Sequence, residues 1–241
     1  MRFFKSQKHS RTKDQLGMKE EKNCWSKDCI YKIEEPYYLL RPHSYSDVGE
    51  WTSLVYCEIN DDGLPIKAAV GFKFSWEPSQ GGGGGGNDDS GGNGFWLICG
   101  DPLESGDTDL IGFEGRWNDA SETHQCEEGS YLFAIQVQSE IDSFHDIPRF
   151  FSFTETDHMG LTNVKLWCKS LIDGSEKSLP VPDAPGPDTW TKREACPEYY
   201  AITGVMLKMQ EYQGDGDDTM LNQIRLVCQR VLSILNITDS S

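Results

Sequence analysis

A unit that ends in a cysteine occurs three times along this sequence. It is clearest at residues 213–228, QGDGDDTMLNQIRLVC. Matching residues stand at the same offsets before Cys99, Cys168 and Cys228, without a gap: Asp88, Asp157 and Asp217; Asp89, His158 and Asp218; Asn93, Thr162 and Asn222; Leu97, Leu166 and Leu226. Copies too small to bury a core alone must pack on one another, so the repeat predicts one domain.

The first half of each unit repeats as well. Trp51, Trp117 and Trp190 precede the opening cysteines Cys57, Cys126 and Cys196. Alternating apolar runs follow at residues 71–77, 134–140 and 204–210, and they end in Glu77, Glu140 and Gln210. Alternation of apolar and polar residues is typical of strands. Each unit therefore reads as Trp, Cys, strand, acidic loop, strand, Cys, with boundaries at about 51–99, 117–168 and 190–228.

Short alternating runs and 24 glycines predict an all-β protein. We expect a single folded domain over residues 37–241, beginning with a strand at 37–41. Residues 1–36 carry many basic side chains, and we predict a disordered basic leader there. The glycine run at 81–86 has no lysine or helix start behind it, so a flexible loop is a better interpretation than a phosphate site.

One segment leaves two structures open. Leu221, Ile224, Cys228, Val231 and Leu235 also fit helical spacing. The matching segments before the other two closing cysteines do not continue that pattern. The repeat therefore favours a strand up to Cys228, and residues 229–235 stay open.

The net charge of −17 favours some classes of binding partner and excludes others. Phosphate binding needs a basic face, so we expect no nucleic-acid partner. An acidic protein attracts cations or basic partners. No apolar run is long enough to span a membrane, so we expect no membrane partner.

Eight cysteines, six of which bracket the repeats, suit disulfide bonds in an oxidising compartment. The repeat predicts Cys57–Cys99, Cys126–Cys168 and Cys196–Cys228, which leaves Cys24 to pair with Cys29. Zinc is the competing interpretation. The sequence has no Cys-x-x-Cys pair and no histidine cluster, so we expect no metal site and no cofactor.

The cysteines predict an extracellular protein, although residues 1–22 hold no apolar core of a signal peptide. The alternatives are a start further upstream, an unusual export route, or a cytosolic protein with reduced thiols. Asn236 lies in an Asn-Ile-Thr sequon, which makes it a candidate glycosylation site in a secreted chain.

Two groups of residues are candidates for ligand binding. The acidic loops carry Asp88, Asp89, Asp217 and Asp218, which could hold Ca²⁺ or work as acid and base on a glycoside. Threefold repetition favours a simpler role, in which these side chains accept backbone N–H bonds in turns. Trp190, like the other repeat tryptophans, could stack on a sugar ring or cap the core.

Other shared polar positions have structural interpretations. Asn93, Thr162 and Asn222 are expected to bond the backbone where a strand begins. Glu77, Glu140 and Gln210 end the first strand of each unit, and catalysis by one of them as a general acid is the less favoured interpretation of this position. His158 replaces an aspartate in the middle copy, which indicates surface variation rather than a base.

Residues 216–228, GDDTMLNQIRLVC, resemble the repeat signature of the vitelline membrane outer layer protein I family. Residues 190–196 and 204–210 fit it too, and the resemblance covers about residues 37–228. It implies a secreted, disulfide-bonded β-prism of three Greek-key sheets around a pseudo-threefold axis. The middle unit departs from the signature at His158 and Thr162, and the first unit has an expanded glycine loop.

The resemblance also implies a function. Members of the family are structural components of egg coats, so we expect a non-catalytic protein of an extracellular coat or matrix, with matrix or coat proteins as partners. The alternative is a lectin or transferase that acts on N-acetylglucosamine oligosaccharides, an activity with which the family has been associated. No catalytic residue is carried over from the family.

Overall fold

The computed structural model describes residues 37–42, 48–61, 65–77, 91–104, 106, 108–115, 120–139, 160–184, 189–210 and 221–230. All of them lie in one compact unit, Glu35–Ser241. The regular structure of these residues consists of strands, as predicted. They are β1 (Tyr38–Leu40), β2 (Glu50–Trp51), β3 (Val55–Tyr56), β4 (Ala68–Trp76), β5 (Gly92–Gly100), β6 (Asp109–Glu114), β7 (Ala120–Gln125), β8 (Ser130–Ser139), β9 (Leu161–Ser170), β10 (Glu176–Ser178), β11 (Glu194–Ala195), β12 (Ala201–Met209) and β13 (Leu221–Gln229).

The strands form three antiparallel sheets. The first sheet has the order β6-β5-β4-β7, and the second has β10-β9-β8-β11. In each, three successive strands pair in turn and a fourth returns beside the first, which is the Greek-key arrangement. Long hairpins form the centres, β4 with β5 and β8 with β9.

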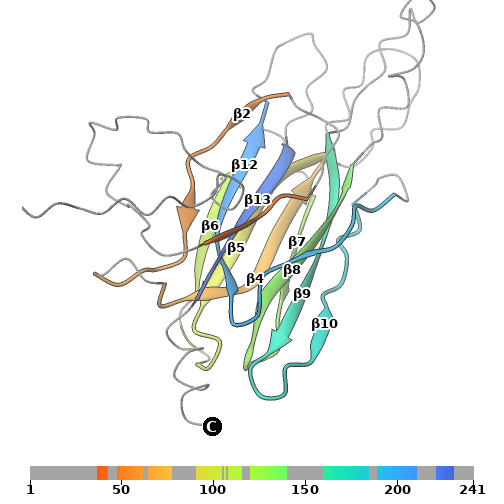
Figure 1. Ribbon diagram of the computed structural model, residues 1–241. Helices are drawn as coiled ribbons and strands as arrows, with labels where there is room; N and C mark the ends of the chain where they lie inside the picture. The colour runs from red at the N-terminus through yellow and green to blue at the C-terminus, as the bar shows by residue number, and fades with distance from the viewer. Residues whose placement is uncertain are drawn as a thin grey trace, which may run out of the picture. The chain divides into compact units, whose positions relative to one another are not determined.

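The third sheet joins the two ends of the described chain. Its central hairpin is β12 with β13. The outer positions are filled by strands from the other end, β1 on β13 and β2 with β3 on β12. Figure 1 shows the blue strand β12 between the blue strand β13 and the orange strand β2. This sheet therefore forms only when strands about 150 to 190 residues apart come together, a long-range contact of the kind that slows folding.

One hydrophobic core lies between the three sheets. The strands β4, β8 and β12 contact one another. Their inward side chains, among them Phe72, Ile135 and Val205, belong to one buried cluster. Polar or charged side chains on the same strands, such as Lys73 and Gln136, face outward and are only half-buried. The three Greek-key sheets around this core make the β-prism that the resemblance implied.

Each central hairpin is interrupted at the same two places. At the end of each hairpin that holds the closing cysteine, one extra residue on the first strand breaks the register. These residues are Val70, Phe133 and Thr203. At the far end, Asn93, Thr162 and Asn222 do the same on the partner strand. Bulges increase the local twist of a strand pair, so their threefold repetition gives the three sheets a common curvature.

The C-terminal ambiguity is settled as far as the structure describes the chain. Leu221–Gln229 is strand β13, with alternate residues in the core, and not a helix. Pairing with both β12 and β1 accounts for this, because tertiary hydrogen bonding outweighs a local helical spacing. Residues 231–235 lie outside the described residues.

The sequence units and the sheets are offset from each other. The opening part of each unit pairs with the preceding sheet rather than with its own hairpin. Trp51 in β2 pairs with Lys208 of β12, and Trp190 forms an isolated bridge with Gln138 of β8. Each repeat unit therefore spans two sheets.

Candidate functional site

Disulfide bonds connect the sheets. Cys57 is bonded to Cys99, with Cα atoms 5.4 Å apart. The bonds Cys126–Cys168 and Cys196–Cys228 each span 5.7 Å between Cα atoms. These are the three pairs expected from the repeat, and Cys24 and Cys29 lie outside the described residues.

Each bond runs from one sheet to the next. Its first cysteine follows the return strand of one sheet, and its second lies in the second strand of the following sheet. Cys57 follows β3 of the third sheet and reaches β5 of the first. The other two bonds join the first sheet to the second and the second to the third. The three disulfides thus link the sheets in a closed ring.

The repeat tryptophans have different surroundings. The guanidinium of Arg225 lies 3.8 Å from the centre of the Trp51 ring, which places a cation on that face. Trp190 is half-buried and bridges to Gln138. Trp117 lies outside the described residues. A covered ring face has less room for a sugar, so the structural role of Trp51 is favoured over stacking.

The other candidates fall largely outside the described residues. These are the acidic-loop residues Asp88, Asp89, Asp157, His158, Asp217 and Asp218, together with Glu140 and the sequon residue Asn236. Their roles remain predictions. Glu77 and Gln210 are buried, with 5% and 7% of their surface exposed.

One of the three bulge residues at strand entry, Thr162, makes the predicted hydrogen bond to the backbone. Thr162 is fully buried, and its hydroxyl donates to the backbone oxygen of Gln138 at 3.2 Å. Asn93 and Asn222 are equally buried at the equivalent positions. A buried polar side chain that bonds backbone holds the strand entry in place.

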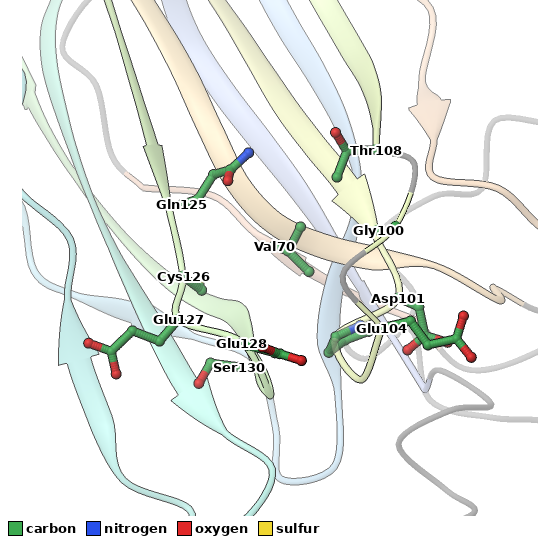
Figure 2. A pocket seen from close by; sticks show the side chains of 12 residues that line it. Val70, Gly100, Asp101, Glu104, Thr108, Gln125, Cys126, Glu127, Glu128 and Ser130 are labelled. Atoms are coloured by element: carbon green, nitrogen blue, oxygen red, sulfur yellow. The ribbon is translucent and has the colours of Figure 1, made fainter.

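A pocket lies between the first and second sheets, at the ends of the strands nearest the disulfide Cys126–Cys168 (Figure 2). It has a volume of about 270 Å³. The start of β4, the end of β5 and the end of β7 form one side, and the turn into β8 forms the other. Backbone bonds hold these segments together, from Gly129 N–H to the Pro102 oxygen at 2.8 Å and from Cys126 N–H to the Val70 oxygen at 2.8 Å.

Four carboxylates line this acidic pocket, those of Asp101, Glu104, Glu127 and Glu128. In Figure 2 the carboxylate of Glu128 points toward Glu104 and Asp101, whereas that of Glu127 points away. Glu127 pairs with Lys177, and Asp101 accepts the Leu103 N–H at 2.9 Å. Among the described residues, the carboxylates of Glu104 and Glu128 have no such partner.

The polar side chains that line the acidic pocket carry oxygen atoms that accept hydrogen bonds. Its carboxylates, with the side chains of Thr108, Gln125 and Ser130, can accept hydrogen bonds from ammonium groups or sugar hydroxyls. Among the residues that the structure describes, no three His, Cys, Asp or Glu side chains are grouped to hold a metal ion. The described part of the chain also contains no helix long and apolar enough to cross a membrane.

This pocket was not among the sites predicted from the sequence. Glu127 and Glu128 directly follow an opening cysteine, and Asp101 follows a closing one after a single residue. Acidic residues beside bracketing cysteines are the signal that could have found it. The disulfides fix where those positions lie, but the sequence alone does not show that two sheets enclose a recess there.

Comparison with known proteins gives relatives along most of the chain. Residues 39–231 match the family described as vitelline membrane outer layer protein I (VOMI). The vitelline membrane outer layer protein 1 homolog of Homo sapiens is 32% identical over 183 residues, which cover 76% of this chain and 79% of that protein. The Mus musculus homolog is 30% identical over 181 residues, 75% of this chain and 79% of the relative.

Solved structures with a similar arrangement include Calystegia sepium agglutinin, at 12% identity and a TM-score of 0.44, covering 80% of this chain and 96% of that one. Another is the prostate-specific WGA16 glycoprotein lectin, at 9% identity and a TM-score of 0.44, covering 79% and 99%. The sequence match over residues 39–231, together with the repeat and its disulfides, leads to one conclusion: this chain belongs to the vitelline membrane outer layer protein I family.

Proposed function

We propose that this protein is a secreted, non-catalytic structural component of an extracellular coat or matrix. The observation that carries the proposal is membership of a family named for the outer layer of the vitelline membrane, matched over residues 39–231. Three disulfide bonds support the compartment, because such bonds persist in oxidising surroundings.

The fold is suited to this role. Bonds between all three pairs of sheets limit their relative movement, and a rigid body loses little entropy when it packs into a matrix. The acidic pocket and the net charge of −17 favour coat or matrix proteins with basic surfaces as partners.

Extraction from the native coat tests the proposal. Isolated coat material is washed with buffers of rising salt, and in parallel with chito-oligosaccharides at low salt. Electrostatic contacts with matrix proteins weaken as the Debye length falls from about 8 Å at physiological salt to about 3 Å at 1 M, so salt releases the protein. Absence from the coat fraction, with the protein found inside cells in a reduced form, would overturn the proposal.

A second candidate function is binding or transfer of N-acetylglucosamine oligosaccharides. The observation in its favour is the acidic pocket, whose carboxylates and hydroxyls can accept hydrogen bonds from sugar hydroxyls. Mass spectrometry of the folded, oxidised protein with chito-oligosaccharides separates the two functions. The structural role predicts neither complexes nor new chain lengths. Products lost in Glu128→Gln or in Asp217→Asn with Asp218→Asn would establish a transferase, and complexes without products a lectin.

A further inference from the structure

The outer side of the second sheet carries a row of cations over two aromatic rings, the half-buried ring of Trp167 and the buried ring of Phe133. On β9, Val164, Leu166 and Cys168 face the core, and Lys165, Trp167 and Lys169 alternate with them on the outer side. Alternate residues of a strand lie about 6.6–6.8 Å apart, so the two lysines are roughly 13 Å apart along the strand. Both are half-buried.

Aromatic rings hold these cations in place. The Lys165 ammonium lies 5.2 Å from the centre of the Trp167 ring, and the Lys169 ammonium lies 5.8 Å from that of Phe133. The guanidinium of Arg193 lies between the two rings, 4.9 Å from Trp167 and 5.0 Å from Phe133. Cations kept over ring faces lose less rotamer freedom when an anion binds. We call Lys165, Trp167, Lys169, Phe133 and Arg193 the cationic face.

The positive charge of this face is only partly neutralised. Arg193 donates to Glu176 at 2.7 Å. Neither Lys165 nor Lys169 forms an ion pair with a carboxylate of the described residues. Lys67 on the first sheet is different, because it contacts both Glu58, at 2.9 Å, and Asp109, at 2.7 Å. The two lysines of the cationic face therefore remain available to an external anion.

The net charge of −17 does not cancel this local charge. At physiological salt the Debye length is about 8 Å, so exposed acids further away are largely screened. The acidic pocket draws on Lys177, which pairs with Glu127, and not on the two lysines of the face. A short-range anion site can therefore exist on an acidic protein.

The face has defined limits. Asn163 donates its amide to the backbone oxygens of Pro182, at 2.9 Å, and Ala184, at 3.3 Å. Gln136 donates to the Thr191 oxygen at 2.8 Å. The connector before β11 is thus held across the Asn163 end of β9. The row from Lys165 to Lys169 begins beyond it, on two central, well-supported strands.

From this arrangement we infer that the cationic face binds an acidic polysaccharide, with sulfate or carboxylate groups repeated along the chain. Cations spaced along an extended strand fit anions spaced along an extended polymer, and charge complementarity directs the contact. The inference deepens the proposed function and rests on it for the compartment in which such polymers occur. It adds a class of partner that the acidic pocket would repel.

The test measures binding of the purified full chain to heparin at several salt concentrations, with neutral dextran as the uncharged probe. We expect heparin to bind and dextran not to bind. Lys165→Gln with Lys169→Gln should weaken heparin binding at least tenfold and reduce the slope of log K against log salt by about 2, one for each lost cation. Lys73→Gln with Lys67→Gln is the matched control, since it removes the same charge from the first sheet and should leave binding within twofold.

Three outcomes would overturn the inference: no binding of heparin, an equal loss in the matched control, or equal binding of polyglutamate, which would indicate an acidic protein partner instead. Circular dichroism of each variant checks that the fold is retained. Failure here leaves the coat-extraction test unaffected, and failure of extraction leaves heparin binding measurable, so the two proposals can fail separately.

Discussion

Tyr199 has a left-handed backbone, with φ of 67°, although it is not glycine. It is the third residue after the opening cysteine Cys196, and the third residue after Cys126 is Gly129, with φ of 78°. Both turns lead into the first strand of a central hairpin. A side chain in this conformation costs roughly 1–2 kcal/mol. The strained residue is 49% exposed, so packing of its ring does not explain why tyrosine is present.

We predict that Tyr199→Gly stabilises the protein by about 0.5–1 kcal/mol, because relief of strain exceeds the extra entropy of a glycine in the unfolded chain. Gly129→Ala is the reciprocal variant. Its new methyl would meet only Ile172, at 3.7 Å, so its cost of about 1 kcal/mol would come from the backbone conformation alone. Urea unfolding measures both. A destabilised Tyr199→Gly would show that the ring makes contacts that outweigh the strain.

Two tyrosines affect stability at high pH. Burial raises the pKa of Tyr131 to about 12, and the charge of Glu198 adds to this. Burial also raises the pKa of Tyr56 well above its usual range, with a smaller contribution from Tyr37. An unfolded tyrosine ionises near pH 10. Above that pH the unfolded state loses protons that the folded state keeps, so the unfolded state gains in stability.

We therefore expect the free energy of unfolding to be unaffected by these groups below about pH 9 and to fall between about pH 10 and 12. Tyr131→Phe should make that fall smaller. Tyr38→Phe, at an exposed position, serves as the control. Denaturant unfolding at fixed pH values measures the effect, and an unchanged pH profile in Tyr131→Phe would contradict it.

At the scale of elements, the third sheet depends on strands from the start of the domain. β1 pairs with β13 in register, with Leu40 opposite Leu226. Leu40 is buried in the common core although its strand has only three residues. β1 covers what would otherwise be an open edge of the central hairpin, and open edges invite pairing with other chains.

Leu40→Ala should cost about 2–4 kcal/mol, because it removes buried methyl groups and loosens the cover over β13. Tyr38→Ala, on the exposed side of the same strand, should cost clearly less despite the loss of its edge-on contact with Tyr200. Thermal unfolding compares them. Light scattering at the midpoint should also show more aggregation for Leu40→Ala, and equal behaviour of the two variants would argue against an edge-covering role.

The sequence predicts the central hairpins better than the outer strands. Hairpin strands show alternation and lie between bracketing cysteines, so residues 71–77 and 221–228 were recognisable. β2, β3 and β11 have two residues each, too few to show a period. Their positions follow from long-range pairing with other sheets. For the same reason, the offset between sequence units and sheets was not apparent from the repeat.

The candidate sites show a similar division. Lys165, Trp167 and Lys169 alternate along one strand, but they were not predicted as a site, because Arg193 and Phe133 join them only in the folded sheet. The acidic pocket likewise needs Asp101, just after β5, to approach Glu128, in the turn between β7 and β8. Patterns within one strand can be read from sequence, whereas surfaces formed by two or more segments depend on topology.

For the whole molecule, the closed ring of disulfides is the main covalent constraint on the chain. The three bonds close loops with separations of 42, 42 and 32 residues. Loop-closure entropy depends on the logarithm of loop length, so these separations give nearly equal stabilisation, differing by about 0.2 kcal/mol. The pseudo-threefold symmetry of the fold thus extends to its energetics.

Replacing one bonded pair by alanines should cost about 2–4 kcal/mol, whichever pair is chosen. The comparison uses Cys57→Ala with Cys99→Ala, Cys126→Ala with Cys168→Ala, and Cys196→Ala with Cys228→Ala. Guanidinium unfolding of the three variants gives the values. Costs that differ by several kcal/mol would show that local packing, and not restriction of the unfolded chain, dominates the effect of the bonds.

Peptide mapping of the native protein from its tissue tests both the ring of disulfide bonds in this prism and the extracellular compartment that we propose for it. Free thiols are alkylated at once, the protein is digested without reduction, and linked peptides are identified by mass spectrometry. We expect linked peptides for Cys57–Cys99, Cys126–Cys168 and Cys196–Cys228, with none of these six cysteines alkylated. Alkylation of all six in the native protein would contradict both the ring of bonds and the extracellular compartment.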